Sequence, residues 1–315
     1  MISQIKSIRI ETGARLHFGL IDTVPPFGGI GVMIDQPATI VQITERDAFT
    51  VTPRYHERAL AIARRFCVIA GRTELPNLAI HVLQAAPPHS GLGSGTQLSL
   101  AIAEGLCRFY DLELPAEAIA VQIADRGKRS AVGVHGYFGG GLIFESCDGN
   151  TDTQLNPIQR RVELPDQWRL VLLRPTVDAS PVSGDEEAEK FSHLSSNSID
   201  DNRLRIMITD TILPAGEAGD FASFADAIEA YNRASGMLFA QAQGGPYNGM
   251  VVTKLIEALK THGARGVGQS SWGPGVFAWC EDETSAQTLA QIISSPSIEV
   301  QIAKVRDDGR RIHSC

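Results

Sequence analysis

Long apolar stretches and closely spaced cysteines are both missing from this sequence, and each absence excludes a class of protein. No apolar run approaches the length that spans a bilayer, and residues 1–6 lack the apolar core of a secretory signal. The five cysteines are scattered without the spacing of metal ligands, and Cys67 and Cys107 fall within apolar helical patterns. We therefore expect a cytoplasmic protein, with no membrane partner and with reduced cysteines in its core.

An excess of positive charge is missing as well. The chain has 28 Lys and Arg against 36 Asp and Glu, for a formal net charge of −8. No general field therefore draws nucleic acid to it, and we expect none as a partner. An anionic substrate must be held by local groups. The 315 residues, of which 43% are hydrophobic and 20% charged, describe an ordinary globular chain that is long enough for two domains.

What the sequence does contain is a glycine-rich loop at 87–96, followed by the helical pattern of 97–110. Glycines at alternate positions allow a sharp turn and a close approach of the backbone to a ligand. The N–H groups and the dipole at the start of a helix then make an anion site. A plain helix cap after a proline turn is the alternative. We predict that the loop binds phosphate, through Gly91, Leu92, Gly93, Ser94, Gly95 and Thr96.

Alternating and helical hydrophobic patterns interleave along the chain without a strict βαβ repeat, which predicts an α+β fold. The expected strands are 7–21, 38–44, 49–52, 78–84, 142–144, 168–173, 276–279 and 298–304. The expected helices are 57–70, 97–110, 115–126, one that begins at 184, 221–238, 251–259 and 284–293. We expect an N-terminal domain at 1–165 and a C-terminal domain at 166–315.

Three segments occur in the order typical of the GHMP kinase superfamily and resemble its motifs: 13–22, 87–96 and 266–275. The phosphate loop of that superfamily has the form Pro-x-x-x-Gly-Leu-Gly-Ser-Ser. The resemblance covers essentially the whole chain. It implies an N-terminal domain like the second domain of ribosomal protein S5, a ferredoxin-like C-terminal domain and a site in the cleft between them. Dimers are usual in the superfamily, so a homodimer is expected.

One branch of the superfamily matches more closely. Five motifs resemble those of β-ribofuranosylaminobenzene 5′-phosphate synthase. They are RLHFGL at 15–20, DRGKRS at 125–130, LPA at 213–215, GGPY at 244–247 and GVGQSSWGP at 266–274. The resemblance implies a glycosyltransferase that joins phosphoribosyl pyrophosphate to 4-aminobenzoate or 4-hydroxybenzoate. This C-glycosylation releases CO₂ and pyrophosphate and belongs to tetrahydromethanopterin biosynthesis. Mg²⁺ is the expected cofactor, and no organic cofactor is expected.

The resemblance and the chemistry together select a candidate site. The candidate catalytic residues are Arg15, His17, Asp22, Arg129 and Ser130. The candidate substrate- and phosphate-binding residues outside the glycine loop are Arg126, Gln269, Ser270, Ser271 and Trp272. Arginine suits a bidentate grip on carboxylate or phosphate, although Arg126 and Arg129 can equally be solvated cations at a helix end.

Metal binding and ring binding make further demands on the chain. Asp22 is the expected Mg²⁺ ligand, with Glu104 as a second candidate. The alternative for Asp22 is a polar residue that ends a strand before a turn. The candidates for aromatic walls around the benzoate ring are Phe18, Tyr137, Phe138 and Trp272. Such aromatics are more often core residues, but the glycines and serines that flank Trp272 favour a loop at that position.

Departures from the kinase pattern bear on the choice of reaction. Superfamily kinases commonly carry a Ser-Gly-x-Asp pattern, whose acid acts on the substrate hydroxyl. Here Gly133 stands at the position of that acid, no carboxylate follows before Glu145, and Gly95 replaces the second serine of the loop. His135 is a candidate polar group in place of the acid. These departures count against an ATP-dependent small-molecule kinase, which is the first alternative; a non-catalytic anion-binding protein is the second.

Overall fold

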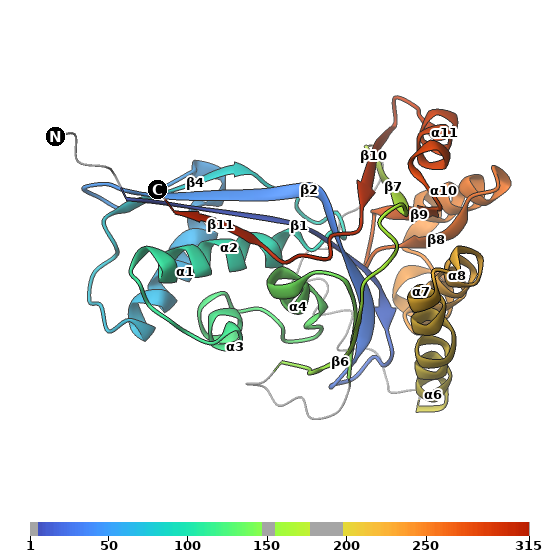
Figure 1. Ribbon diagram of the computed structural model, residues 1–315, viewed down its shortest axis with the longest axis horizontal. Coiled ribbons are helices and arrows are strands. Elements are labelled where there is room, and N and C mark those ends of the chain that lie inside the picture. The colour runs from blue at the N-terminus through green and yellow to red at the C-terminus, as the bar shows by residue number, and fades with distance from the viewer. Residues whose placement is uncertain (1–5, 147–154, 177–197, 315) are drawn as a thin grey trace.

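The computed structural model describes residues 6–146, 155–176 and 198–314. The helix predicted from 184 lies outside these residues, as do Cys147 and Cys315. Within them, the chain forms two β-sheets flanked by helices, in two halves that lie side by side (Figure 1).

The larger sheet belongs to the N-terminal half and is built on one long hairpin. Its strands are β1 (Ser7–Leu20), β2 (Gly29–Glu45), β3 (Thr50–Val51), β4 (Leu78–Gln84), β5 (Leu142–Glu145), β6 (Ile158–Val162) and β11 (Arg311–Ser314). They run in the order β11-β1-β2-β4-β3, while β5 pairs with both β2 and β6. The helical elements of this half are η1 (Pro53–Tyr55), α1 (His56–Ile69), α2 (Ser94–Phe109), α3 (Ala116–Ala118), the π-helical η2 (Ile119–Ile123) and α4 (Val132–Gly139).

The smaller sheet belongs to the C-terminal half. Its strands run in the order β10 (Ile298–Lys304), β7 (Arg169–Pro175), β9 (Val276–Cys280) and β8 (Arg265–Gln269). The helices around it are α6 (Ser198–Met207), the π-helical η3 (Ile208–Ile212), α7 (Leu213–Ala218), α8 (Phe221–Met237), α9 (Ala240–Gln243), α10 (Gly249–Thr261) and α11 (Glu283–Ile293).

Alternation along the strands divides the apolar side chains among separate cores. In β9, Phe277 and Trp279 join a core with α8, whereas Val276 and Ala278 join one with α10 and α11. The smaller sheet is thus buried on both faces. In the N-terminal half, Ile8 of β1 packs with α1 and α2 in a core of its own.

The long hairpin also joins the two halves. After the register shift between Thr12 and Ala14, the second half of β1 places Leu16 and Phe18 in the core with α8. Figure 1 shows β1 and β2 running from one half into the other, and the red β11 returning beside β1. The functional residues of β1 therefore lie where the halves meet.

Most of the predicted elements are confirmed, with shifted ends. β4 and β10 have the predicted bounds, α2 begins three residues earlier than predicted, at Ser94, and β2 is far longer than the predicted 38–44. α4 was missed because its segment is dense in glycine, and β6, β8 and β11 because their apolar alternation is weak. The predicted boundary at 165 lies between β6 and β7; as a division into domains it stays a prediction.

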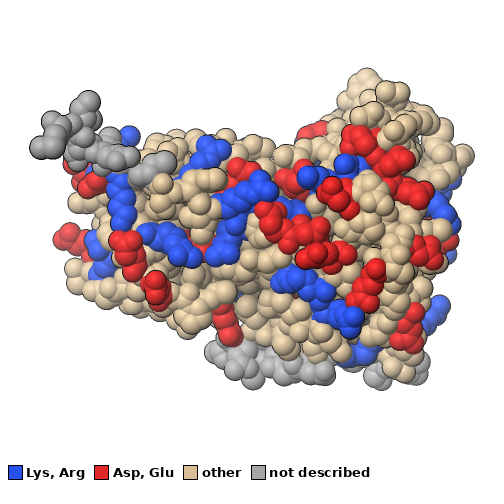
Figure 2. Space-filling view, viewed as in Figure 1, with Lys and Arg blue, Asp and Glu red and all other residues tan. Residues whose placement is uncertain are grey.

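Basic and acidic side chains are interspersed over the face drawn in Figure 2. Among the helices in the described ranges, none combines the length and the apolar character needed to cross a membrane.

Candidate active site

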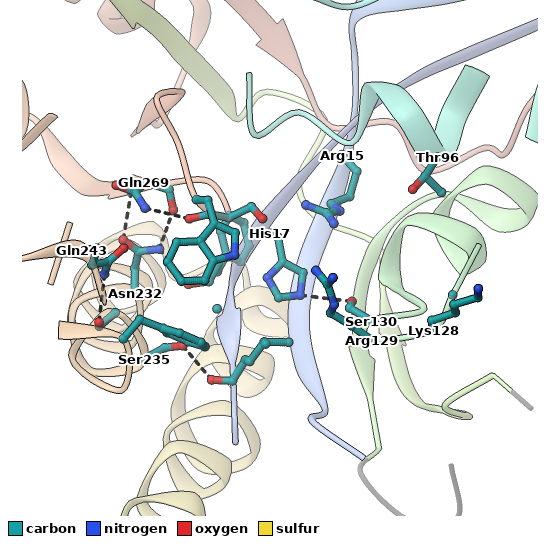
Figure 3. A pocket seen from close by; sticks show the side chains of 18 of the residues that line it. Arg15, His17, Thr96, Lys128, Arg129, Ser130, Asn232, Ser235, Gln243 and Gln269 are labelled. Atoms are coloured by element: carbon teal, nitrogen blue, oxygen red, sulfur yellow. Dashed lines mark hydrogen bonds between the residues drawn. The ribbon is translucent and has the colours of Figure 1, made fainter. Parts of the chain in front are cut away.

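A cavity of about 570 Å³ lies at the junction of the two halves. Its wall comes from β1, the 125–130 segment, the C-terminal end of α8 and the 269–272 segment, as Figure 3 shows. The predicted site residues that line it are Arg15, His17, Thr96, Arg126, Arg129, Ser130, Gln269, Ser271 and Trp272. The predicted residues that do not line it are Asp22, Gly91, Leu92, Gly93, Ser94, Gly95 and Ser270.

β1 contributes Arg15 and His17, which are two positions apart and therefore lie on one face of the strand. The His17 side chain is almost wholly buried, and its Nε2 lies 3.1 Å from the Ser130 hydroxyl (Figure 3). Burial, and then the charge of Arg15, lowers the pKa of His17 well below its usual value. The imidazole is therefore neutral at physiological pH.

The glycine loop is held by the protein on both sides. A Cβ on Gly91 would lie 2.2 Å from the carbonyl oxygen of Ser270, and Ser270 donates from its hydroxyl to the carbonyl of Gly91 at 2.7 Å. The Arg15 N–H donates to the carbonyl of Leu92 at 3.0 Å. The 270 segment therefore approaches closely enough to require glycine at 91, and the approach of a ligand to the loop stays a prediction. Of the loop, only Thr96 lines the cavity.

The 269–272 segment connects the other two segments through its polar groups. Gln269 accepts from the Asn248 N–H at 2.7 Å and donates to the carbonyl of Ser271 at 2.7 Å, so both ends of its amide are held. Ser270 is fully buried, and its hydroxyl accepts from the His17 N–H at 3.0 Å. The Ser271 N–H donates to the carbonyl of His17 at 3.1 Å. The three segments that carry the sequence resemblance thus form one hydrogen-bonded unit.

Cations dominate the charged part of the cavity wall. Arg15, Arg126, Lys128 and Arg129 line it, whereas Asp125 is the only carboxylate among the lining residues that the structure describes. Asp125 forms an ion pair with Lys128 at 2.8 Å. Burial, and then the charge of Arg58, lowers the pKa of Arg126, which donates to the Ser99 hydroxyl at 3.1 Å. The wall therefore favours an anionic ligand.

An aromatic pair forms another part of the wall. Trp272 and Phe239 both line the cavity, with ring centroids 5.2 Å apart at an interplanar angle of 71°. Phe18 also contributes to the lining, but its side chain is fully buried against Phe277. Tyr137 lies in the core with α2, and neither it nor Phe138 lines the cavity. Of the four predicted aromatic residues, Phe18 and Trp272 line it, and a wall around the benzoate ring stays a prediction.

The position that carries an acid in kinases of the superfamily is empty of any carboxylate. A Cβ on Gly133 would lie 3.4 Å from Thr96 Cγ2 and 3.6 Å from Arg15 Nε, so an acid here would face the Arg15 guanidinium. Glu145 does not line the cavity and is fully buried behind it. His135 contacts the backbone oxygen of Asn156 at 2.7 Å and does not line the cavity either.

The two predicted Mg²⁺ ligands are engaged elsewhere. The Asp22 carboxylate accepts from the N–H groups of Thr23 at 2.6 Å and Val24 at 3.3 Å, as expected of a residue that ends a strand before a turn. Glu104 is nearly fully buried and binds Tyr137 at 2.8 Å and Arg310 at 2.7 Å. No cluster of three His, Cys, Asp or Glu with metal-binding geometry occurs among the described residues. Mg²⁺ as a cofactor stays a prediction.

Polar residues of α8 complete the site and were missed by the sequence analysis. Asn232 donates to the carbonyls of Phe18 at 2.7 Å and Gln269 at 2.8 Å, and Ser235 donates to that of Leu20 at 2.6 Å. These bonds fix β1 and the 269 segment to one helix. The only signal was two polar residues, three positions apart, on the apolar face of a predicted helix.

Comparisons with known proteins agree with this architecture. Residues 55–143 match the model of the GHMP kinases N terminal domain, and residues 212–298 match that of the GHMP kinases C terminal domain. Beta-ribofuranosylphenol 5′-phosphate synthase of Methanothermobacter thermautotrophicus is 27% identical over 92% of this chain and 94% of its own. The protein of the same name from Archaeoglobus fulgidus is 28% identical over 97% of this chain and 99% of its own.

A solved structure supports the fold alone. The homoserine kinase from Cytophaga hutchinsonii has a TM-score of 0.68 at 15% identity and covers 98% of this chain and 97% of its own. The expected α+β fold with two domains of the GHMP type is confirmed.

Proposed function

We propose that this chain, which belongs to the GHMP kinase superfamily and within it to the β-ribofuranosylphenol 5′-phosphate synthase branch, joins phosphoribosyl pyrophosphate to a 4-hydroxy- or 4-aminobenzoate. The ring carbon that bears the carboxylate forms a bond to the anomeric carbon of the ribose, and pyrophosphate and CO₂ leave. We further propose that this reaction serves tetrahydromethanopterin biosynthesis, as the resemblance implies. The homodimer expected of the superfamily stays a prediction.

One observation carries the proposal: the same cavity combines four cationic side chains with an aromatic pair. Arg15, Arg126, Lys128 and Arg129 suit a substrate with several phosphate groups, and Trp272 with Phe239 suits a flat ring. A volume of about 570 Å³ lies within the usual range of small-molecule sites.

Departure of pyrophosphate requires that its developing charge be stabilised. Arg126 and Lys128 line the same cavity as Thr96, which lies in the N-terminal turn of α2, where the helix dipole favours an anion. Mg²⁺, if bound here, would supply further positive charge for the departing pyrophosphate. Asp125 is the carboxylate placed to approach such an ion from the wall.

Capture of the ribosyl cation by the benzoate ring depends on how the ring is oriented relative to the anomeric carbon. The ring carbon is nucleophilic because the para substituent donates electrons into the ring, so the enzyme gains most by holding the ring over the anomeric carbon. Contact with the Trp272 face, backed by Phe239, provides this restraint.

The benzoate carboxylate must be held until the new bond forms. Arg15 and Arg129 line the cavity near His17 and Ser130, as Figure 3 shows, and a guanidinium can bind a carboxylate through two hydrogen bonds. The space at Gly133 leaves Arg15 facing the substrate instead of an acid of the protein.

An ATP-dependent kinase is the alternative, favoured by the shared fold with homoserine kinase. Phosphoryl transfer rests mainly on electrostatics and does not strictly need a base. The deciding experiment offers the purified protein phosphoribosyl pyrophosphate, Mg²⁺ and each benzoate in turn, and separately ATP with small alcohols. Release of CO₂ and pyrophosphate supports the synthase, whereas ADP formation in the second set, with no product in the first, supports the kinase.

A further inference from the structure

The GGPY motif at 244–247 contributes to the resemblance, but no step of the proposed function uses it or the Asn248 that follows it. This segment joins α9 to α10 and packs closely on the end of α8, since a Cβ on Gly236 would lie 2.1 Å from the carbonyl oxygen of Pro246. Gly236 and Pro246 are among the described residues that line the cavity, and Asn248 is not. Asn248 can therefore act on a substrate through the residues that it holds.

Capping of α10 is the role usually expected of an asparagine at this position. Asn248 is the residue before the first turn of the helix, where an asparagine side chain commonly accepts a hydrogen bond from a backbone N–H two or three positions later. The Asn248 side chain makes no such bond in the described helix. Its Nδ2 instead donates to the carbonyl of Trp272 at 2.9 Å. Because a capping side chain accepts, capping does not explain this donated hydrogen bond.

Asn248 holds the 269–272 segment at two points. Besides the side-chain bond to Trp272, its backbone N–H donates to Gln269 Oε1 at 2.7 Å, and Gln269 Nε2 donates in turn to the carbonyl of Ser271 at 2.7 Å. Ser271 has a φ of +55°, a left-handed conformation that a serine keeps only where its surroundings impose it. Loss of a restraint should therefore let this backbone relax and carry the Trp272 side chain with it.

The place of the Trp272 indole decides the shape of one side of the cavity. The indole lies against Phe239, with ring centroids 5.2 Å apart, and 9% of Trp272 is exposed. Figure 3 shows Gln269, from the same segment as Trp272, well apart from Thr96 and Lys128. A displaced indole should therefore alter the aromatic side of the cavity and leave its cationic side intact.

We propose that Asn248 is a positioning residue, which through the carbonyl of Trp272 holds the indole in the wall that contacts the ring of the acceptor. The proposal rests on the proposed function for the identity of that ring. The amide donor of Asn248 is the group that matters, because the backbone N–H to Gln269 is kept by every replacement except proline. Loss of this donor should affect the benzoate and spare phosphoribosyl pyrophosphate.

Two substitutions separate positioning from capping. Asn248→Asp replaces the Nδ2 donor by an oxygen that the Trp272 carbonyl repels, but aspartate caps a helix as well as asparagine does, and its charge suits a helix N-terminus. Asn248→Ala removes the donor without adding a charge. Asp282→Ala is the matched control, because Asp282 caps α11 by accepting from the Ser285 N–H at 2.7 Å and lies outside the cavity.

Steady-state kinetics with phosphoribosyl pyrophosphate and 4-hydroxybenzoate gives the first readout. Both Asn248 variants should raise KM for the benzoate about 3- to 10-fold, the effect of one lost hydrogen bond, and leave KM for phosphoribosyl pyrophosphate unchanged. Asp282→Ala should lower Tm and leave both KM values unchanged. In a Trp272→Ala background, Asn248→Ala should raise KM for the benzoate no further, because the ring that it positions is gone.

Fluorescence of Trp272 gives the second readout and needs no substrate. Subtraction of the spectrum of Trp272→Phe isolates this indole from Trp168 and Trp279, which are nearly fully buried. In both Asn248 variants, the Trp272 emission should shift to longer wavelength and be quenched more readily by acrylamide, because the indole leaves the wall. A residue that only stabilises α10 would not produce this change in Asn248→Asp.

An unchanged KM for the benzoate in both Asn248 variants would overturn the proposal, and so would an unchanged Trp272 emission or additive effects of Asn248→Ala and Trp272→Ala. If Asn248→Ala does not fold, Asn248→Asp decides the question alone. A wild type that forms no product from either benzoate would contradict the proposed function. The fluorescence comparison would then still show whether Asn248 holds Trp272 in place.

Discussion

Replacing Gly91 by alanine tests whether the three segments of the site are held together as the structure places them. The Gly91 backbone has a φ of +78°, and an added Cβ would lie 2.2 Å from the carbonyl oxygen of Ser270. Gly71 provides a matched control, because its φ is +64° and a Cβ there would meet nothing within 4 Å. Both variants carry the cost of a left-handed alanine, but only one carries the clash.

The magnitudes separate the two variants. Left-handed backbone costs an alanine about 1–2 kcal/mol, which is the whole effect expected at Gly71. At Gly91 the forced separation from Ser270 adds about 1–3 kcal/mol of overpacking, and disturbance of the Ser270 hydrogen bond adds about 1 kcal/mol. We expect Gly91→Ala to be less stable than Gly71→Ala by about 2–4 kcal/mol, and to bind pyrophosphate more weakly.

Thermal unfolding followed by circular dichroism measures the difference in stability, and isothermal titration with pyrophosphate measures the affinity. Each kcal/mol is worth about 2–4 °C in a domain of this size, so the two Tm values should differ by several degrees. Equal Tm values and equal affinities in the two variants would refute the packing of the glycine loop on the 270 segment.

Three further predictions concern single side chains. Arg129→Ala should weaken the binding of an anionic ligand by about 1.5–3 kcal/mol, measured by titration with pyrophosphate and with each benzoate; unchanged affinity for all of them would make Arg129 a surface cation. Trp272→Ala should raise KM for the benzoate about tenfold and leave the affinity for pyrophosphate unchanged, and the opposite pattern in steady-state kinetics would remove Trp272 from the ring site. Because the folded Glu145 carboxyl holds its proton to about pH 7, against a usual value of 4.5, the wild type should lose about 3 kcal/mol of unfolding free energy as pH rises between these values. Glu145→Gln should lack this slope in urea unfolding, and a slope equal to that of the wild type would contradict the burial of the charge.

The fold was predictable where one hydrophobic period dominates. The apolar faces of α1 and α8 and the alternation of β4 and β10 indicate these elements directly. The sequence offered no comparable signal for β8, which begins with Arg265-Gly266 and is paired because β9 lies beside it. The length of β2 was missed for a similar reason, since its first half is dense in glycine and buried on both faces.

The site was predictable as a set of segments but not as a set of roles. Arg15, His17 and Trp272 line the cavity as their motifs suggested. Ser270 and Gly91, from the same motifs, bind each other instead. This contact could not be predicted, because a hydrogen bond to a backbone carbonyl far away in the sequence does not depend on the type of residue that carries the carbonyl. The contact of Glu145 with the Ala131 N–H depends on the pairing of β5 with β2, which the sequence does not reveal.

Carboxyl-labelled 4-hydroxybenzoate, supplied with phosphoribosyl pyrophosphate and Mg²⁺, tests the central claim most directly. The account predicts that labelled CO₂ and pyrophosphate are released in equal amounts, with a ribosylated phenol as the third product. Retention of the label in the benzoate, with no pyrophosphate formed from this acceptor or from 4-aminobenzoate, would contradict it.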